Sequence, residues 1–212
     1  MLGYKIKEIF YSLQGEGYYS GSPAVFCRFS GCNLWSGKEP GRAEASCVFC
    51  DTDFSGTDGE NGGIYENERV LAQTIGTLWP KEKHYVKKFV VCTGGEPLLQ
   101  LNKELVDALH KKDFYIAVET NGTIEAPKID WLCVSPKAGA NLAQKSGNEL
   151  KLVYPQEHDD PQKYLDLDFQ HFFLQPMDGP QHEENLRKTL EYVLDHPRWR
   201  LSLQMQKILR IK

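Results

Sequence analysis

Three cysteines in one polar loop are the residues whose types and spacing could do chemistry. Cys47-Val-Phe-Cys50 is a Cys-x-x-Cys pair, and Cys32 precedes it with 14 intervening residues. Three thiolates from one loop make a soft-metal site, suited to zinc or to an iron–sulfur cluster. The spacing by itself ranks these two interpretations equally, with unligated thiols third, because Cys-x-x-Cys is also half of a zinc site. By contrast, Cys27, Cys92 and Cys133 stand in apolar, strand-like runs, where a buried thiol packs as a small hydrophobe.

A second motif favours the cluster. Thr93-Gly-Gly-Glu-Pro97 directly follows an apolar strand, and the glycines allow a close backbone approach to a ligand. With Phe49 just before the last cysteine, the chain resembles the radical S-adenosylmethionine superfamily. The resemblance implies that Cys32, Cys47 and Cys50 hold a [4Fe–4S] cluster and that the Gly-Gly-Glu turn meets the methionine amino group. The match departs from the commonest spacing of the superfamily, which has three residues between the first two cysteines.

Further polar motifs stand where strands end. Glu119-Thr-Asn-Gly122 and Ser135-Pro-Lys137 close two strand-like runs, and Ser12-Leu-Gln-Gly-Glu-Gly17 precedes the strand that carries Arg28. Ligands bind at the carboxyl ends of strands in parallel α/β sheets. Taken singly, each motif is also an ordinary turn or strand terminator. Together, from Leu13 to Asp178, they resemble the 7-carboxy-7-deazaguanine synthases.

The resemblance implies a reaction and its cofactors. 6-Carboxy-5,6,7,8-tetrahydropterin would contract to 7-carboxy-7-deazaguanine with loss of ammonia, in the biosynthesis of queuosine and other 7-deazapurines. The cofactors would be the [4Fe–4S] cluster, S-adenosylmethionine and Mg²⁺. The alternatives are another radical S-adenosylmethionine enzyme, such as a glycyl-radical activase, and a noncatalytic scaffold that carries zinc or an iron–sulfur cluster.

The resemblance also assigns residues to ligands. The expected substrate contacts are Leu13, Gln14, Gly15, Glu16, Arg28, Thr93, Glu119, Asn121 and Lys212. The expected contacts with S-adenosylmethionine are Phe49, Gly94, Gly95, Glu96, Ser135, Pro136, Lys137, Gln175, Pro176, Met177 and Asp178. Thr52 is the expected ligand of Mg²⁺, which prefers hard oxygen atoms.

Several of these residues have a simpler interpretation. The planar fork of Arg28 suits a substrate carboxylate, but an exposed strand arginine is equally ordinary. The Thr52 hydroxyl could cap a turn, and Lys137 could be a solvated surface lysine. Gln14, Glu16, Glu119 and Asn121 carry the acceptors and donors that a pterin's amide and amino groups require, although surface turns use the same residue types.

Strands and helices alternate along the chain. The expected strands are 5–11, 24–29, 89–92, 115–118, 131–135, 149–153, 172–174 and 201–204, and the expected helices are 66–79, 99–112 and 182–195. A full eightfold barrel needs about 250 residues. With 212 residues we therefore expect an α/β fold of the radical S-adenosylmethionine type, a partial barrel reduced in helices. It would be one domain, 1–212, with a cluster-binding loop at about 31–63.

Composition limits the partners. The formal net charge is −4, which provides no broad footprint for nucleic acid or an anionic membrane. No apolar stretch is long enough to span a bilayer, and the first residues lack a secretory h-region, so we expect a cytoplasmic protein. The resemblance implies a small pterin substrate, an electron donor such as flavodoxin or ferredoxin, and a homodimer.

Overall fold

The computed structural model describes residues 3–81 and 87–212. Within them, one nine-stranded sheet has the order β3-β1-β2-β4-β5-β6-β7-β8-β9. Its strands are β1 (Tyr4–Leu13), β2 (Pro23–Phe29), β3 (Gly63–Tyr65), β4 (Lys88–Gly94), β5 (Phe114–Thr120), β6 (Trp131–Val134), β7 (Ser146–Tyr154), β8 (Asp168–Pro176) and β9 (Trp199–Leu201).

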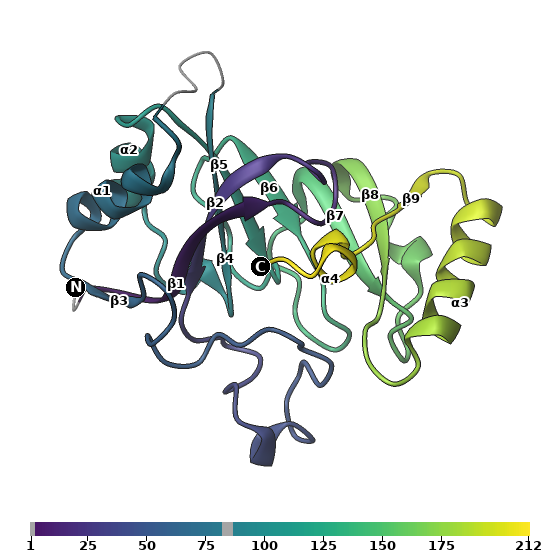
Figure 1. The fold of residues 1–212 in the computed structure, drawn as a ribbon. Helices are drawn as coiled ribbons and strands as arrows, with labels where there is room; N and C mark the ends of the chain where they lie inside the picture. The colour runs from purple at the N-terminus through teal and green to yellow at the C-terminus, as the bar shows by residue number, and fades with distance from the viewer. Residues whose placement is uncertain (1–2, 82–86) are drawn as a thin grey trace.

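The sheet is mostly parallel. β1 runs antiparallel to both β2 and β3, whereas every neighbouring pair from β2 to β9 is parallel. The carboxyl ends of β2 and β4–β9 therefore meet at one edge. The sheet curves into an open, incomplete barrel, and the loop between β2 and β3 projects beyond this edge (Figure 1).

Few helices cover the sheet. They are α1 (Glu68–Leu78), α2 (Lys103–His110), α3 (His182–Asp195) and the short α4 (Met205–Leu209). α1 and α2 lie side by side at one end of the sheet, and α3 packs against β8 and β9 at the other (Figure 1). Asparagine side chains cap the first two helices: Asn67 accepts from two backbone N–H groups of α1, and Asn102 accepts from Leu105 N of α2. None of the helices in the described ranges is long and apolar enough to cross a membrane.

The central strands form the core. Val90, Val91 and Cys92 of β4 are buried, as are Ile116 and Val118 of β5. Parallel strands are covered on both faces, so they form near-continuous apolar runs rather than alternating ones. This explains why the sequence located them so well.

Most element boundaries shift by a few residues from the prediction, and the C-terminal strand, the second helix and an edge strand differ most clearly. The last strand was expected at 201–204, but β9 is Trp199–Leu201, and the short helix α4 follows it. The expected helix 99–112 shortens to Lys103–His110, because Pro97–Leu99 forms a separate 3-10 turn. The short edge strand β3 was not predicted, because its three residues carry no periodic signal.

Candidate active site

A cavity of about 440 Å³ opens at the carboxyl ends of the strands. Its wall combines the strand ends, the cysteine loop and the last residues of the chain. The predicted site residues that line it are Leu13, Gln14, Gly15, Glu16, Arg28, Cys32, Cys47, Phe49, Cys50, Thr52, Thr93, Gly94, Gly95, Glu119, Asn121, Ser135, Lys137, Gln175, Pro176, Asp178 and Lys212. Three predicted residues do not line it: Glu96, Pro136 and Met177.

The three loop cysteines share this cavity wall. A hydrogen bond between the thiols of Cys47 and Cys50 lowers the pKa of Cys50 to about 6 and raises the pKa of Cys47. Thiolates are the form that binds metals. Among the described residues, no three His, Cys, Asp or Glu side chains form a group that could hold a single metal ion. A cubane cluster places each cysteine on a different iron. The three cysteines line one cavity, and thiolates are the usual ligands of such a cluster.

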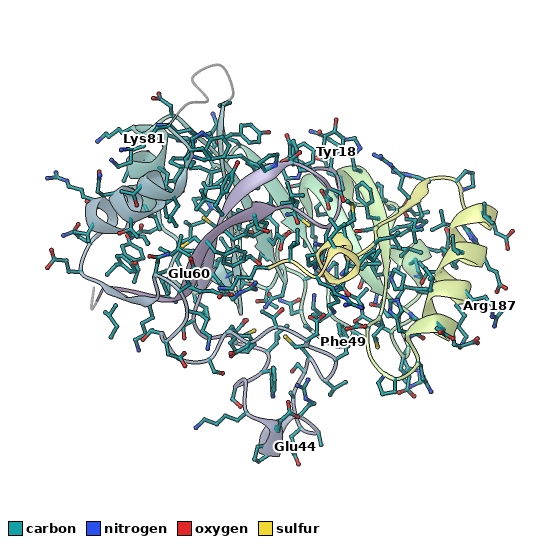
Figure 2. All side chains as sticks on the ribbon, in the orientation of Figure 1. Tyr18, Glu44, Phe49, Glu60, Lys81 and Arg187 are labelled. Carbon is teal, nitrogen blue, oxygen red and sulfur yellow. The ribbon has the colours of Figure 1, made fainter. Side chains whose placement is uncertain are left out.

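Arg42 organises the long insertion between Cys32 and Cys47. Its guanidinium lies 4.0 Å from the ring centroid of the buried Trp35. One terminal nitrogen donates to the carbonyls of Val48 (3.0 Å) and Cys50 (2.9 Å). The insertion thus folds back on the Cys-x-x-Cys turn. Phe49 sits between the sheet edge and the far tip of this loop, which Glu44 marks (Figure 2).

The Gly-Gly turn packs against the segment that leads to Cys32. Gly94 has φ +134, and a side chain there would place its Cβ 2.2 Å from the Phe29 carbonyl oxygen. A Cβ on Gly95 would lie 2.1 Å from the Gly31 oxygen. Both distances are too short for any side chain, so these positions require glycine. The turn therefore brings β4 close to the first cysteine.

Glu96 lies behind the cavity wall rather than in it. The residue is fully buried, and its carboxylate accepts from Thr120 Oγ1 and from the backbone N–H groups of Asn121 (both 2.8 Å) and Leu98 (3.0 Å). Burial raises the pKa of this carboxyl above its ordinary value. Its contacts tie the ends of β4 and β5 together.

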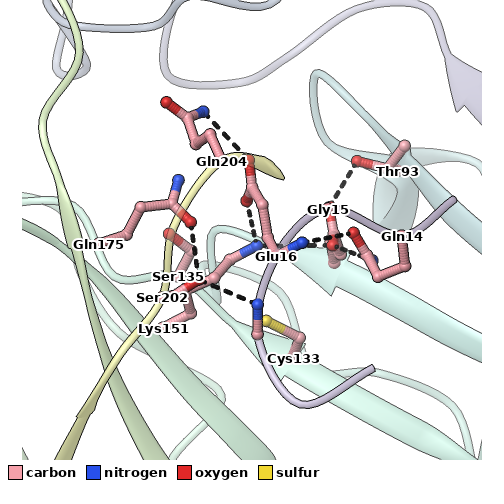
Figure 3. A network of polar contacts seen from close by, with 12 residues as sticks. Gln14, Gly15, Glu16, Thr93, Cys133, Ser135, Lys151, Gln175, Ser202 and Gln204 are labelled. Atoms are coloured by element: carbon pink, nitrogen blue, oxygen red, sulfur yellow. Dashed lines mark hydrogen bonds and ion pairs between the residues drawn. The ribbon is translucent and has the colours of Figure 1, made fainter. Parts of the chain in front are cut away.

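A network of charges forms the opposite wall (Figure 3). Glu119 accepts from Gln14 Nε2 and from Thr93 Oγ1, each at 3.0 Å. Lys151 Nζ lies 2.6 Å from Glu16 Oε2 and 3.5 Å from Glu119 Oε1. The three charged groups come from the turn after β1, from β5 and from β7. The fold thus gathers two carboxylates and one ammonium from distant parts of the chain.

The C-terminal segment closes over this network. Gln204 and Gln206 donate to Glu16 Oε1 at 3.0 and 2.8 Å, and Met205 N donates to the Gly15 carbonyl at 3.0 Å. Lys207 pairs with Asp178 at 2.6 Å and also with Asp51. These contacts join the cysteine loop, β8 and the end of the chain.

Other predicted residues have identifiable partners. Arg28 Nε donates to Glu8 Oε1 at 3.0 Å, so this arginine is neither free nor fully exposed. Lys137 Nζ donates to the Ser135 hydroxyl at 2.7 Å and lies in the cavity wall rather than on the open surface. Thr52 Oγ1 is 3.5 Å from Asp51 Oδ1.

The remaining predicted residues lie at the edge of the site. Asn121 Nδ2 donates to Asn33 Oδ1 at 3.0 Å and faces Cys32 Sγ at 4.0 Å. Pro136 lines a neighbouring pocket, and the backbone of Met177 bonds to Tyr154. Lys212 Nζ pairs with Glu60 at 3.0 Å and with Glu8 at 3.4 Å.

Sequence reasoning missed several lining residues. They are Glu8, Asp51, Lys151, Gln204, Gln206 and Lys207. Lys151 had a usable signal, because a lysine inside the apolar run Leu150–Val153 is costly to bury without a partner. The residues of the last segment had none, since their approach to Glu16 depends on the path of the chain after β9.

Comparison with known proteins gives close relatives. The chain is 56% identical over 209 residues to the 7-carboxy-7-deazaguanine synthase of Burkholderia multivorans, a match covering 98% of this chain and 99% of that one. It is also 56% identical to the enzyme of that name from Caulobacter vibrioides, over 97% and 98% of the two chains. The crystal structure of QueE from Escherichia coli superposes with a TM-score of 0.69 at 27% identity, covering 96% of this chain and 95% of that one. No family model matches the chain.

Proposed function

Since the chain belongs to the 7-carboxy-7-deazaguanine synthase family, we propose that its cavity binds the cluster, S-adenosylmethionine and the pterin substrate side by side. The protein is a radical S-adenosylmethionine lyase of the queuosine pathway with the incomplete barrel of that class. The glycyl-radical activase and the zinc scaffold are thereby set aside. One observation carries the proposal: three cysteines and a pair of carboxylates line a single cavity.

Cys32, Cys47 and Cys50 would hold the cluster. When bound, the cluster and S-adenosylmethionine supply the radical chemistry that removes a hydrogen atom from the substrate. The protein's part is to hold and orient the reactants and to exclude competing reactions. The position of all three thiols in the wall of one cavity supports this assignment.

The charged wall would read the substrate. Glu16 and Glu119 offer carboxylate oxygens to the N–H groups of the pterin, and Gln14 can both donate and accept. Arg28 would take the substrate carboxylate, with Glu8 fixing its Nε and leaving the rest of the guanidinium to the cavity. Leu13, Gly15, Thr93, Asn121 and Lys212 would complete this side of the site.

The remaining lining residues would bind S-adenosylmethionine. Phe49, Gly94, Gly95, Ser135, Lys137, Gln175, Pro176 and Asp178 line the cavity and would contact it directly. Glu96, Pro136 and Met177 would act from behind, by shaping the backbone that carries these residues. Thr52 would ligate Mg²⁺ through its hydroxyl, with water and substrate oxygens filling the other positions.

The molecule as a whole suits this role. One sheet and one hydrophobic core run through the described residues, which supports a single domain over 1–212 with the cluster loop at about 31–63. Free cysteines and an oxygen-sensitive cluster suit a reducing cytoplasm. The expected partners are a second copy of the chain and a small electron-transfer protein such as flavodoxin or ferredoxin, and not nucleic acid or membrane.

An anaerobic assay tests the proposal. The reconstituted protein is incubated with S-adenosylmethionine, dithionite, Mg²⁺ and 6-carboxytetrahydropterin, and products are identified by mass spectrometry. We expect carboxydeazaguanine and ammonia, with S-adenosylmethionine regenerated. Accumulation of 5′-deoxyadenosine without carboxydeazaguanine would refute the substrate assignment. Omitting Mg²⁺ in the wild type and in Thr52→Val tests the metal assignment, since only the wild type should respond to added Mg²⁺.

A further inference from the structure

Lys151 is a buried cation in the cavity wall, and it belongs to none of the sequence motifs described above. Its side chain is 6% exposed and projects from β7, close to Glu16 (Figure 3). Lys151 Nζ lies 2.6 Å from Glu16 Oε2 and 3.5 Å from Glu119 Oε1. Across the ranges 3–81 and 87–212, it is the only cation that forms an ion pair with either of them. Both carboxylates therefore depend on one ammonium.

The other hydrogen-bond partners of these two carboxylates are neutral side chains. Glu16 Oε1 receives the amides of Gln204 and Gln206, and Glu119 receives Gln14 and Thr93. The amides of Gln204 and Gln206 favour the ionised form of Glu16, but they carry no positive charge. Among the described residues, Lys151 supplies the one positive charge that is paired with both carboxylates.

We propose that Lys151 is a positioning residue for the pterin, because its ammonium binds both Glu16 and Glu119 and holds them aimed as a pair of acceptors. This inference rests on the proposed function, since it assumes that the two carboxylates read the N–H groups of the substrate. Lys151 acts through the carboxylates and holds the spacing between them.

Electrostatics around the ammonium support this role. Burial alone would lower the pKa of Lys151, but Glu119 and Glu16 raise it well above its ordinary value, so the lysine stays charged. Burial alone would raise the pKa of Glu16, but Lys151, together with the amides of Gln204 and Gln206, lowers it to about 2. The other titratable groups that face Lys151 are Cys133 of β6, Glu149 of β7 and, beyond β6, Lys137.

Loss of the ammonium has a specific consequence. Glu16 and Glu119 are only partly exposed, with side chains 16% and 23% accessible. Without a cation between them, two carboxylates held this close do not both ionise readily, so we expect one of them to take up a proton between about pH 5 and 8. A protonated carboxyl loses an acceptor for the substrate. Removing Lys151 should therefore weaken substrate binding and make that binding depend on pH in a range where the native enzyme is insensitive.

The test compares the reconstituted holoenzyme with Lys151→Met, which keeps the length of the side chain and removes its charge. We expect the substrate KM to rise roughly tenfold or more, while the Kd for S-adenosylmethionine and the iron content stay within about twofold of the wild type. The profile of kcat/KM should gain an acidic limb between about pH 5 and 8, falling as pH falls. Lys145→Met, an exposed lysine just before β7, is the matched control and should behave as the wild type.

Each outcome decides the matter. A raised KM with no new acidic limb would mean that Lys151 contacts the substrate itself, and an unchanged KM would remove it from recognition; both overturn the inference while the proposed function stands. Wild-type protein that does not turn over the carboxypterin defeats the proposed function and the inference together.

Two further variants protect the test. If Lys151→Met does not fold, Lys151→Arg is the test variant, because it keeps the positive charge. It must show a higher substrate KM without an acidic limb in the profile of kcat/KM against pH. An acidic limb in Lys151→Arg would refute the positioning role. The double variant Lys151→Met/Glu16→Gln must also lack the limb, since only one carboxylate remains. A limb that persists there refutes the coupling.

Discussion

At the scale of single residues, Cys50 and Cys92 show how surroundings decide what a thiol does. Cys50 lies on the cavity wall with a low pKa, whereas Cys92 is fully buried in β4 and burial raises its pKa to about 12. We predict that Cys50→Ala abolishes cleavage of S-adenosylmethionine and changes the free energy of unfolding by less than about 1 kcal/mol. The Cys92→Ala variant should bind as much iron as the wild type, and its free energy of unfolding should fall by about 1 kcal/mol. Iron content, cofactor cleavage and circular dichroism separate the two, and retained cleavage in Cys50→Ala would remove Cys50 from the cluster.

Arg28 is the residue on which the substrate carboxylate should depend. Its Nε is already bonded to Glu8, so the guanidinium is oriented before any ligand arrives. Since hydrogen bonds to charged groups are worth about 1.5–3 kcal/mol, Arg28→Ala should raise the substrate KM roughly ten- to hundredfold and leave the affinity for S-adenosylmethionine unchanged. The substrate KM of Arg28→Lys should lie between those of the wild type and Arg28→Ala, because lysine keeps the charge but lacks the planar fork of the guanidinium. Steady-state kinetics measure both, and an unchanged KM in Arg28→Ala would refute the carboxylate role.

Most of the residues that the sequence singled out line one cavity, because each short motif stands at a strand end, where ligands bind in parallel sheets. Other details depend on folding. That Glu96 meets the methionine amino group stays a prediction; without a ligand, its carboxylate bonds to Thr120 and to the backbone of Asn121 and Leu98. Whether a carboxylate turns toward a cavity or away from it depends on contacts between strands, and these cannot be inferred from the neighbours of the residue in the sequence.

At the scale of elements, the insertion between the first two cysteines is the part whose path the sequence left open. Arg42 resolves it by binding the carbonyls of Val48 and Cys50. We predict that Arg42→Met releases iron to a chelator several times faster than the wild type, because the Cys-x-x-Cys turn loses two hydrogen bonds. Arg187→Met is a matched control, since Arg187 also pairs with a glutamate three residues before it but lies on α3. Equal release rates for the two variants would contradict the role of Arg42.

The C-terminal segment is the element that sequence analysis placed least well. It was expected to leave a strand and end near the substrate, whereas β9 ends at Leu201 and α4 then docks on the turn at Gly15 and Glu16. We predict that deleting residues 204–212 raises the substrate KM by roughly tenfold or more and leaves the cluster intact. Absorbance of the cluster and steady-state kinetics measure the two effects. Ile208→Ser, on the exposed side of α4, should leave both unchanged, and a deletion that keeps the native KM would contradict the prediction.

At the scale of the whole molecule, the fold class could be predicted from the alternation of apolar strands and helices, which is typical of a parallel sheet. The balance of buried charge did not follow, because it depends on which groups from different strands meet. Glu16 has a lowered pKa, whereas burial raises the pKa of Glu96 and of Glu149. These carboxyls therefore act on stability in opposite directions as pH changes.

The pH dependence of unfolding tests this balance. A raised pKa means that the folded state binds the proton more tightly than the unfolded chain. Glu96 and Glu149 should therefore increase the free energy of unfolding as pH falls from neutrality through their folded pKa values toward 4.5. Glu16 has the opposite sign: its contribution is complete above pH 4.5 and is lost as pH falls toward 2. Urea unfolding of cluster-free protein from pH 7 to 2.5 should show a maximum. In a plot of the free energy of unfolding against pH, Glu149→Gln should reduce the slope on the neutral side of the maximum. Glu16→Gln should reduce the slope on the acid side. If the acid-side slopes of the wild type and of Glu16→Gln coincide, the Glu16–Lys151 pair does not stabilise the fold.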